Sequence, residues 1–246
     1  MTLPAVPSRL LPVVAALAMA LALVVVPGAR AGAADPLDGA PAQGTCYNLT
    51  PEQAAATTLP APVPCTEPHT HWVGRSLAAP DGLELKAGPK LDSFSITVCD
   101  RGRRELVGTD DRAWALSAYR TFYFLPTRAQ RSAGSRWVTC LVAVVAGNGF
   151  VTTRAETPEP TDALPLPQSI TSCQNARVQI VPCSKPHRAR GVAGETIYEG
   201  RMTAGRADTL AVTQCPKITA GYNGVFLMRR VAAARNVLIC FRSTRG

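Results

Sequence analysis

The chain lacks the short motifs by which the common classes of enzyme are recognised. It contains no G-x-S-x-G nucleophile elbow, no H-E-x-x-H zinc motif and no Gly-rich phosphate loop ending in G-K-[ST]. It has no C-x-x-C pair either, which excludes a zinc ribbon and a thioredoxin-type redox site. Its acidic residues are not placed as a glycosidase pair. We therefore predict a protein that is not an enzyme and that uses no cofactor and no metal.

Lysine is scarce, and the composition does not indicate a low-complexity sequence. Lysine accounts for four of the 26 basic residues, and arginine supplies the other 22. This preference, with many Ala, Gly and Pro, is typical of GC-rich bacterial genes. The hydrophobic fraction of 46% excludes disorder as a description of the whole chain.

Long apolar runs are absent except near the N-terminus. Arg9 precedes an uncharged run over residues 10–26, which is followed by a Pro-Gly break and the small-residue triplet at residues 29–31. This order predicts a secretory signal peptide over residues 1–31. An uncleaved N-terminal anchor is the alternative, since the run approaches the length of roughly 20 residues that spans a bilayer. We expect a secreted or extracytoplasmic cell-surface protein.

Two similar segments follow in the mature part. Residues 63–69 read V-P-C-T-E-P-H and residues 181–187 read V-P-C-S-K-P-H, with five identities in seven positions. Each segment contains one cysteine. In each half of the mature chain, one further cysteine precedes the segment and two follow it. We therefore interpret the chain as a tandem duplication of a four-cysteine module. An even number of cysteines in an exported chain indicates disulfides. The cysteines are Cys46, Cys65, Cys99, Cys140, Cys173, Cys183, Cys215 and Cys240.

A proline-rich linker is expected between the modules. Residues 152–169 contain four prolines and three acidic residues without an apolar period, which predicts an extended, exposed segment. The first module then covers residues 44–151, after a polar tether at residues 32–43, and the second covers residues 170–246.

The first module has a net charge of +2, and the second, with 12 basic and 3 acidic residues, has +9. Outside the cell such a basic module favours an anionic wall polymer, phospholipid headgroups or an acidic protein over nucleic acid. A solvated arginine face is the alternative.

The local patterns predict an α+β fold of two small disulfide-bonded modules, each with a mainly antiparallel sheet and one or two short helices. Short first loops favour sequential pairing of the cysteines, among the three connectivities that each module allows. The expected pairs are Cys46–Cys65, Cys99–Cys140, Cys173–Cys183 and Cys215–Cys240. The expected strands cover residues 72–74, 138–145, 177–181 and 236–241, and the expected helices cover residues 111–119 and 207–213.

The repeated histidine is the best candidate for chemistry. Prolines on both sides of the motif cysteine hold the segment rigid and present His69 and His187 at one fixed place in each module. His71 makes a Zn²⁺ or Cu²⁺ pair with His69 conceivable, but the second segment has no matching histidine. We therefore favour a histidine that is bonded to a nearby backbone carbonyl and fixes the turn.

The whole layout resembles the septum-formation family of actinobacterial exported proteins. Cys46, residues 63–69, Cys99 and residues 134–140 follow the pattern C…V-x-C-[ST]-x-P-H…C…G-[DS]-R-x-x-x-C. The second module keeps C-S-K-P-H and four cysteines but lacks the Gly-Arg-Trp approach to the last one. The resemblance implies a secreted or membrane-tethered domain that is linked to cell division, with no established activity or cofactor.

We accordingly expect a non-catalytic cell-envelope protein that binds an anionic wall polymer or an envelope or division protein at the septum. The basic second module would be the contact face, and no nucleic acid would be bound. A secreted enzyme or metal-dependent protein that uses the repeated histidine is the alternative. The predicted binding residues are His69, His187, Arg229, Arg230 and Arg235.

Overall fold

The computed structural model describes residues 35–232 and 234–244. These described residues all belong to one compact unit. The predicted signal segment at residues 1–31 therefore lies outside the described residues. None of the helices within residues 35–232 and 234–244 combines the length and the hydropathy that a membrane-spanning segment needs.

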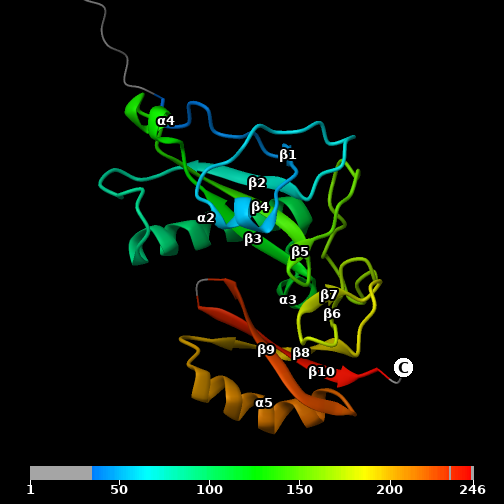
Figure 1. Cartoon of the computed structure of the whole chain (residues 1–246). Helices are drawn as coiled ribbons and strands as arrows, with labels where there is room; N and C mark the ends of the chain where they lie inside the picture. The colour runs from blue at the N-terminus through cyan, green and yellow to red at the C-terminus, as the bar shows by residue number, and fades with distance from the viewer. Residues whose placement is uncertain (1–34, 233, 245–246) are drawn as a thin grey trace, which may run out of the picture. The chain divides into compact units, whose positions relative to one another are not determined.

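The first sheet has five antiparallel strands with the order β1-β2-β4-β3, and β5 pairs with β4 (Figure 1). Its central strand β4 reads WVTCLVAVVA and is buried over its first eight residues. A mostly apolar run of this kind is expected where both faces of a strand are enclosed. The strands are β1 (Cys46–Tyr47), β2 (His71–Ala78), β3 (Tyr119–Phe124), β4 (Trp137–Ala146) and β5 (Gly149–Phe150).

The second sheet is also antiparallel, with the order β7-β6-β8-β10-β9. Here β10 is the enclosed strand, and its residues 236–241 are all buried. In both sheets the last cysteine, Cys140 or Cys240, lies on the enclosed strand. The strands are β6 (Ser172–Gln174), β7 (Ile180–Pro182), β8 (Ala189–Glu199), β9 (Tyr222–Ala232) and β10 (Arg235–Ser243).

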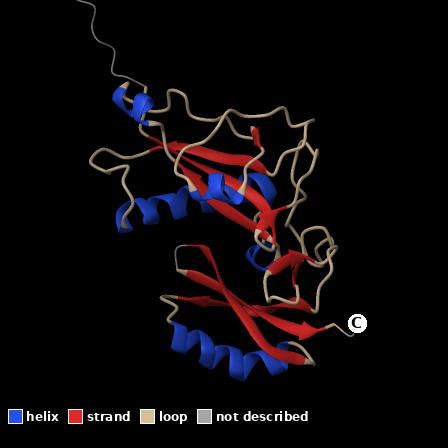
Figure 2. Ribbon diagram, in the orientation of Figure 1, coloured by secondary structure: helices blue, strands red, loops and turns tan. Residues whose placement is uncertain are grey.

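The four disulfides have the sequential pairing that the sequence favours. Cys99–Cys140 and Cys215–Cys240 each tie a helix to the enclosed strand of a sheet. Cys46–Cys65 and Cys173–Cys183 each tie the first strand of a sheet to the motif segment. Two antiparallel sheets with short helices and four disulfides confirm the predicted α+β class (Figure 2).

Helix α2 packs against the first sheet at a contact between two glycines. A Cβ atom added to Gly74 would lie 2.8 Å from the backbone carbonyl of Gly102, and one added to Gly102 would lie 3.0 Å from the backbone nitrogen of Arg75. The helix and the strand can therefore approach this closely only because neither position carries a side chain. The helices are α1 (Pro51–Ala55), α2 (Pro89–Val107), α3 (Asp111–Leu116), α4 (Arg128–Ser132) and α5 (Ala204–Ile218).

One hydrophobic cluster includes side chains from both sheets. The cluster contains Trp72 and Val142 of the first sheet and Ile239 and Phe241 of the second. Trp114 of α3 also belongs to it. The two sheets thus share a core. The module boundaries expected at residues 44–151 and 170–246 remain a prediction.

The segment expected as a linker is largely exposed but is fixed to the first sheet and to α2. The Tyr119 hydroxyl donates to the carbonyl of Glu159 at 3.1 Å, and the Thr161 hydroxyl donates to the carbonyl of Val107 at 3.0 Å. Leu166 is buried in the shared core. Residues 152–169 therefore serve as a packed strap in this structure.

Candidate functional site

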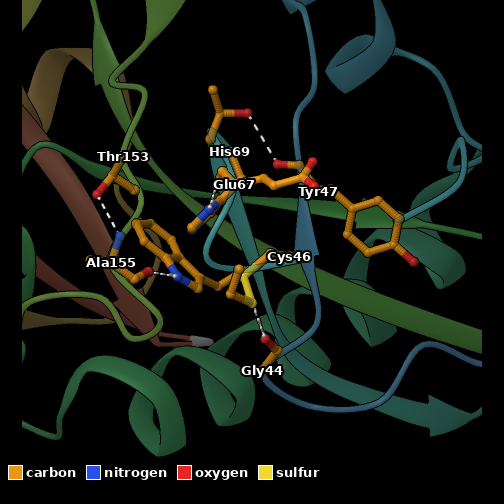
Figure 3. Close-up of a disulfide and its surroundings, with 10 residues drawn as sticks. Gly44, Cys46, Tyr47, Glu67, His69, Thr153 and Ala155 are labelled. Atoms are coloured by element: carbon orange, nitrogen blue, oxygen red, sulfur yellow. Dashed lines mark hydrogen bonds between the residues drawn. A yellow bond between two sulfur atoms is a disulfide. The ribbon is translucent and has the colours of Figure 1, made fainter. Parts of the chain in front are cut away.

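The two motif histidines have the same local geometry. Nδ1 of His69 lies 2.9 Å from the carbonyl oxygen of Glu67, and Nδ1 of His187 lies 2.8 Å from that of Lys185 (Figure 3 shows the first). In both segments the ring thus closes a turn onto the carbonyl two residues earlier. This confirms the bond to a nearby backbone carbonyl that the sequence favoured.

His69 is fully buried beneath the strap. It exchanges two backbone hydrogen bonds with Thr153, each of 2.9 Å, and its ring contacts Trp72 edge-on with centroids 5.0 Å apart. The Trp72 indole in turn donates to the carbonyl of Ala155 at 3.1 Å (Figure 3). A ligand in solution does not reach this ring, because it is fully buried. The prediction that His69 is a binding residue was therefore wrong.

His71 is buried in a different, aromatic environment. Its Nδ1 lies 2.8 Å from the Thr70 hydroxyl oxygen, and its ring packs edge-on against Phe122 and Phe150. Burial lowers the pKa of His71 to about 3, so the ring is neutral at neutral pH. The described residues contain no group of three His, Cys, Asp or Glu side chains that could hold a metal ion.

His187 is partly exposed, unlike His69. A surface cavity of about 410 Å³ lies beside it and is lined also by Arg177 and Arg188. Both arginines are exposed, and no carboxylate lines the cavity. His187 therefore keeps its place among candidate binding residues, in basic surroundings.

Arg235 takes part in an ion-pair network instead of facing solvent alone. Asp111, at the start of α3, accepts from the guanidinium groups of Arg103, Arg104 and Arg235, each at 2.6 Å. Asp100 accepts from Arg103 and Arg104 as well. Because Arg235 pairs with this carboxylate, it stabilises the contact between β10 and α3.

Arg229 is buried, which corrects its predicted role on the contact face. Its guanidinium donates to the carbonyl groups of Ala115, Ser117 and Tyr119, and only 8% of the residue is exposed. Burial, with Arg120 and Arg103 nearby, holds the pKa of Arg229 well below its usual value. No local pattern indicates this burial, because the three carbonyl groups that accept from Arg229 lie more than 100 residues earlier in the sequence.

Arg230 is exposed, as predicted, and it borders a surface cavity. This cavity of about 790 Å³ lies at the start of α5 and is lined also by Arg201, with an apolar part that includes Met202 and Met228. Arg206, in the first turn of α5, donates to the carbonyl of Arg201. Sequence analysis did not single out Arg201 or Arg206, because α5 was expected to begin only at residue 207.

One comparison with known proteins finds a match. A family model described as septum formation matches residues 99–241. The matched range crosses the boundary between the two expected modules and excludes residues 44–98, so the tandem duplication itself remains a prediction. No curated protein and no solved structure matches the chain.

Proposed function

Because the chain belongs to the septum-formation family, we propose that it acts in septum formation by binding an anionic polymer of the cell envelope without catalysing a reaction. Four disulfides and the family indicate an extracytoplasmic location. A signal peptide at residues 1–31, cleaved or kept as an anchor, would bring the protein there.

The exposed charge of the second sheet and its helix carries this proposal. Between residues 170 and 244, eight basic residues are exposed, whereas the acidic residues are Glu195, Glu199 and Asp208. None of these three carboxylates forms an ion pair among the described residues. The excess of positive charge therefore faces the solvent, where it attracts polyanions. The eight are Arg177, Lys185, Arg188, Arg201, Arg206, Lys217, Arg230 and Arg242.

The cavity at the start of α5 is the best candidate for the centre of contact. Arg201 and Arg230 line it, Arg206 is adjacent, and the first turn of the 15-residue helix carries no acidic residue to offset the helix dipole. A lining that combines arginines with methionines suits a polymer with anionic groups on an uncharged backbone. Of the predicted group Arg229, Arg230 and Arg235, this surface keeps Arg230.

Binding to isolated cell walls tests the proposal. We expect wild-type protein to bind walls from its host, with affinity that falls as salt rises, and to bind poorly after the anionic polymers are extracted. The double variant Arg201→Gln/Arg206→Gln should bind about ten- to thirtyfold more weakly, since each cation near an anionic surface contributes about 1 kcal/mol.

The matched control is Arg101→Gln/Arg128→Gln, which removes the same charge from two exposed positions of the first half. It should retain wild-type affinity. Binding that is insensitive to salt, or that falls equally in both double variants, would contradict a specific basic contact face. Loss of a measurable hydrolytic activity in a folded His187→Ala protein would instead favour the enzyme alternative.

A further inference from the structure

An excess of positive charge lies where the two sheets meet. Arg120 and Arg229 both donate to the carbonyls of Ser117 and Tyr119, and neither forms an ion pair with a carboxylate among the described residues. Burial lowers the pKa of Arg120 to about 10. The junction holds more arginine than aspartate: Arg103, Arg104, Arg120, Arg229 and Arg235 against Asp100 and Asp111.

Arg103 connects the ion pairs of this junction to the unpaired arginines. It is 1% exposed, and it donates to Asp100, Asp111 and the carbonyl of Val231 in β9. Its Nη1 is buried and has no hydrogen-bond partner in the described part of the chain. A buried guanidinium nitrogen without an acceptor destabilises the folded protein, because no hydrogen bond replaces the hydration that it has lost.

Arg103 lines a cavity of about 200 Å³ between α2, α3, β3 and β9. In Figure 1 the end of β9 at its hairpin lies toward α2, in agreement with the bond from Arg103 to Val231. Thr121, Trp114 and Arg230 also line it, as does Asp100. Asp100 is already neutralised by Arg103 and Arg104, so it does not make the cavity anionic.

We propose that this cavity binds a small oxyanion, either a phosphate or a carboxylate group. Nη1 of Arg103 and the guanidinium of Arg230 would donate to its oxygens, and the Thr121 hydroxyl would supply a further donor. Guanidinium groups suit such ligands because their N–H donors match the spacing of the oxygens. The anion would offset the charge of Arg229 and Arg120, and it would join β3 and α2 of the first half to β9 of the second.

This site is separate from the cell-wall contact at Arg201 and Arg206, and only Arg230 borders both cavities. Its ligand stabilises the folded protein by mass action, since the unfolded chain has no such site. Binding is therefore measured without any assumption about the envelope.

The test is thermal unfolding and calorimetric titration of the oxidised full chain with sodium phosphate, sodium acetate or sodium chloride at equal ionic strength. We expect a saturable rise in Tm with one of the two oxyanions, by about 5–10 °C at one hundred times its Kd. Whether phosphate or acetate gives the larger rise identifies the group. Equal shifts with all three salts would overturn the proposal.

Variants locate the effect. Thr121→Val should weaken oxyanion binding about tenfold or more through the lost donor, and Ile96→Trp should abolish it by filling the cavity. Thr97→Val, an exposed threonine one position further along α2, is the matched control and should leave the affinity unchanged. Unchanged affinity in both Thr121→Val and Ile96→Trp would also overturn the proposal.

Arg201→Gln/Arg206→Gln should keep the phosphate or acetate response even if cell-wall binding is lost. This variant therefore separates a failure of the oxyanion site from a failure of the proposed cell-wall contact.

Discussion

The guanidinium of Arg229 lies over the indole of Trp114, with its Cζ atom 4.7 Å from the ring centroid. The first residue is on β9 and the second on α3, so this contact joins the second sheet to a helix of the first half of the chain. Arg103 of α2 lies over the same indole at 5.1 Å. The negative face of the ring partly offsets two cations that are buried close together. Trp114 therefore supplements the two aspartates in stabilising the buried arginines.

Removing the buried guanidinium should destabilise the protein strongly. Arg229→Met keeps most of the volume but leaves the carbonyl of Ala115 without this donor, and it removes three charge-assisted hydrogen bonds. Relief of the desolvation penalty offsets part of that loss. We expect the free energy of unfolding in urea to fall by about 2–4 kcal/mol. Arg242→Met, at an exposed position on β10, should change it by less than about 0.5 kcal/mol. Similar values for the two variants would show that Arg229 does not hold the sheets together.

Two helical glycines should respond oppositely to the same substitution. A Cβ at Gly102 would lie within about 3.1 Å of Gly74 and Arg75 on β2, so Gly102→Ala forces α2 away from the sheet and should cost about 1–3 kcal/mol. A Cβ at Gly205 of α5 would meet nothing within 4 Å, so Gly205→Ala should stabilise by about 0.5–1 kcal/mol through helix propensity. Chemical unfolding of both variants checks the difference. Equal effects would mean that the contact between α2 and β2 yields without cost.

The disulfides should differ in their contribution to stability according to the length of chain they close. Cys99–Cys140 spans 41 residues and Cys173–Cys183 spans 10. Loop entropy predicts a loss of about 4 kcal/mol for the double alanine variant of the first pair and about 3 kcal/mol for the second. Comparing the two urea transitions tests this order. The reverse order would indicate that packing around the bridges, rather than the unfolded chain, decides their effect.

Much of the fold was predictable because the enclosed strands and the cysteines carry strong local signals. The strands expected at residues 138–145 and 236–241 are the cores of β4 and β10. The strand expected at residues 177–181 was wrong in its first half. Val178 adopts a positive φ of 61° in a turn, and β7 begins only at Ile180.

The longest helix in the described part of the chain, by contrast, was not predicted from its residues. Helix α2 contains the run Ile96-Thr97-Val98 and the interior Gly102, all poor helix formers. Its stability comes from packing on the first sheet and from the disulfide at Cys99, which no local pattern reveals. The same limit applies to the site, because the burial of Arg229 and the cover over His69 depend on segments far away in the sequence.

Acid should destabilise the protein through His71. A histidine in the unfolded chain has a pKa of about 6.5, whereas burial lowers the pKa of His71 in the folded protein to about 3. Between these values the unfolded chain takes up a proton that the folded protein does not. The free energy of unfolding therefore falls as the pH is lowered from 6.5 toward 3, by about 2–3 kcal/mol between pH 7 and pH 4.5.

The variant His71→Leu isolates this contribution from that of the carboxylates. Leucine suits the space between Phe122 and Phe150 and cannot be protonated, so the variant should lose less stability than wild type over the same pH interval. Urea unfolding at pH 7 and pH 4.5 gives the two differences directly. Parallel losses in the two proteins would mean that the His71 ring takes up its proton in the folded state, with the aromatic pocket open to water. A smaller loss in the variant would establish that the pocket stays closed and that the histidine beside the motif is a neutral part of the core.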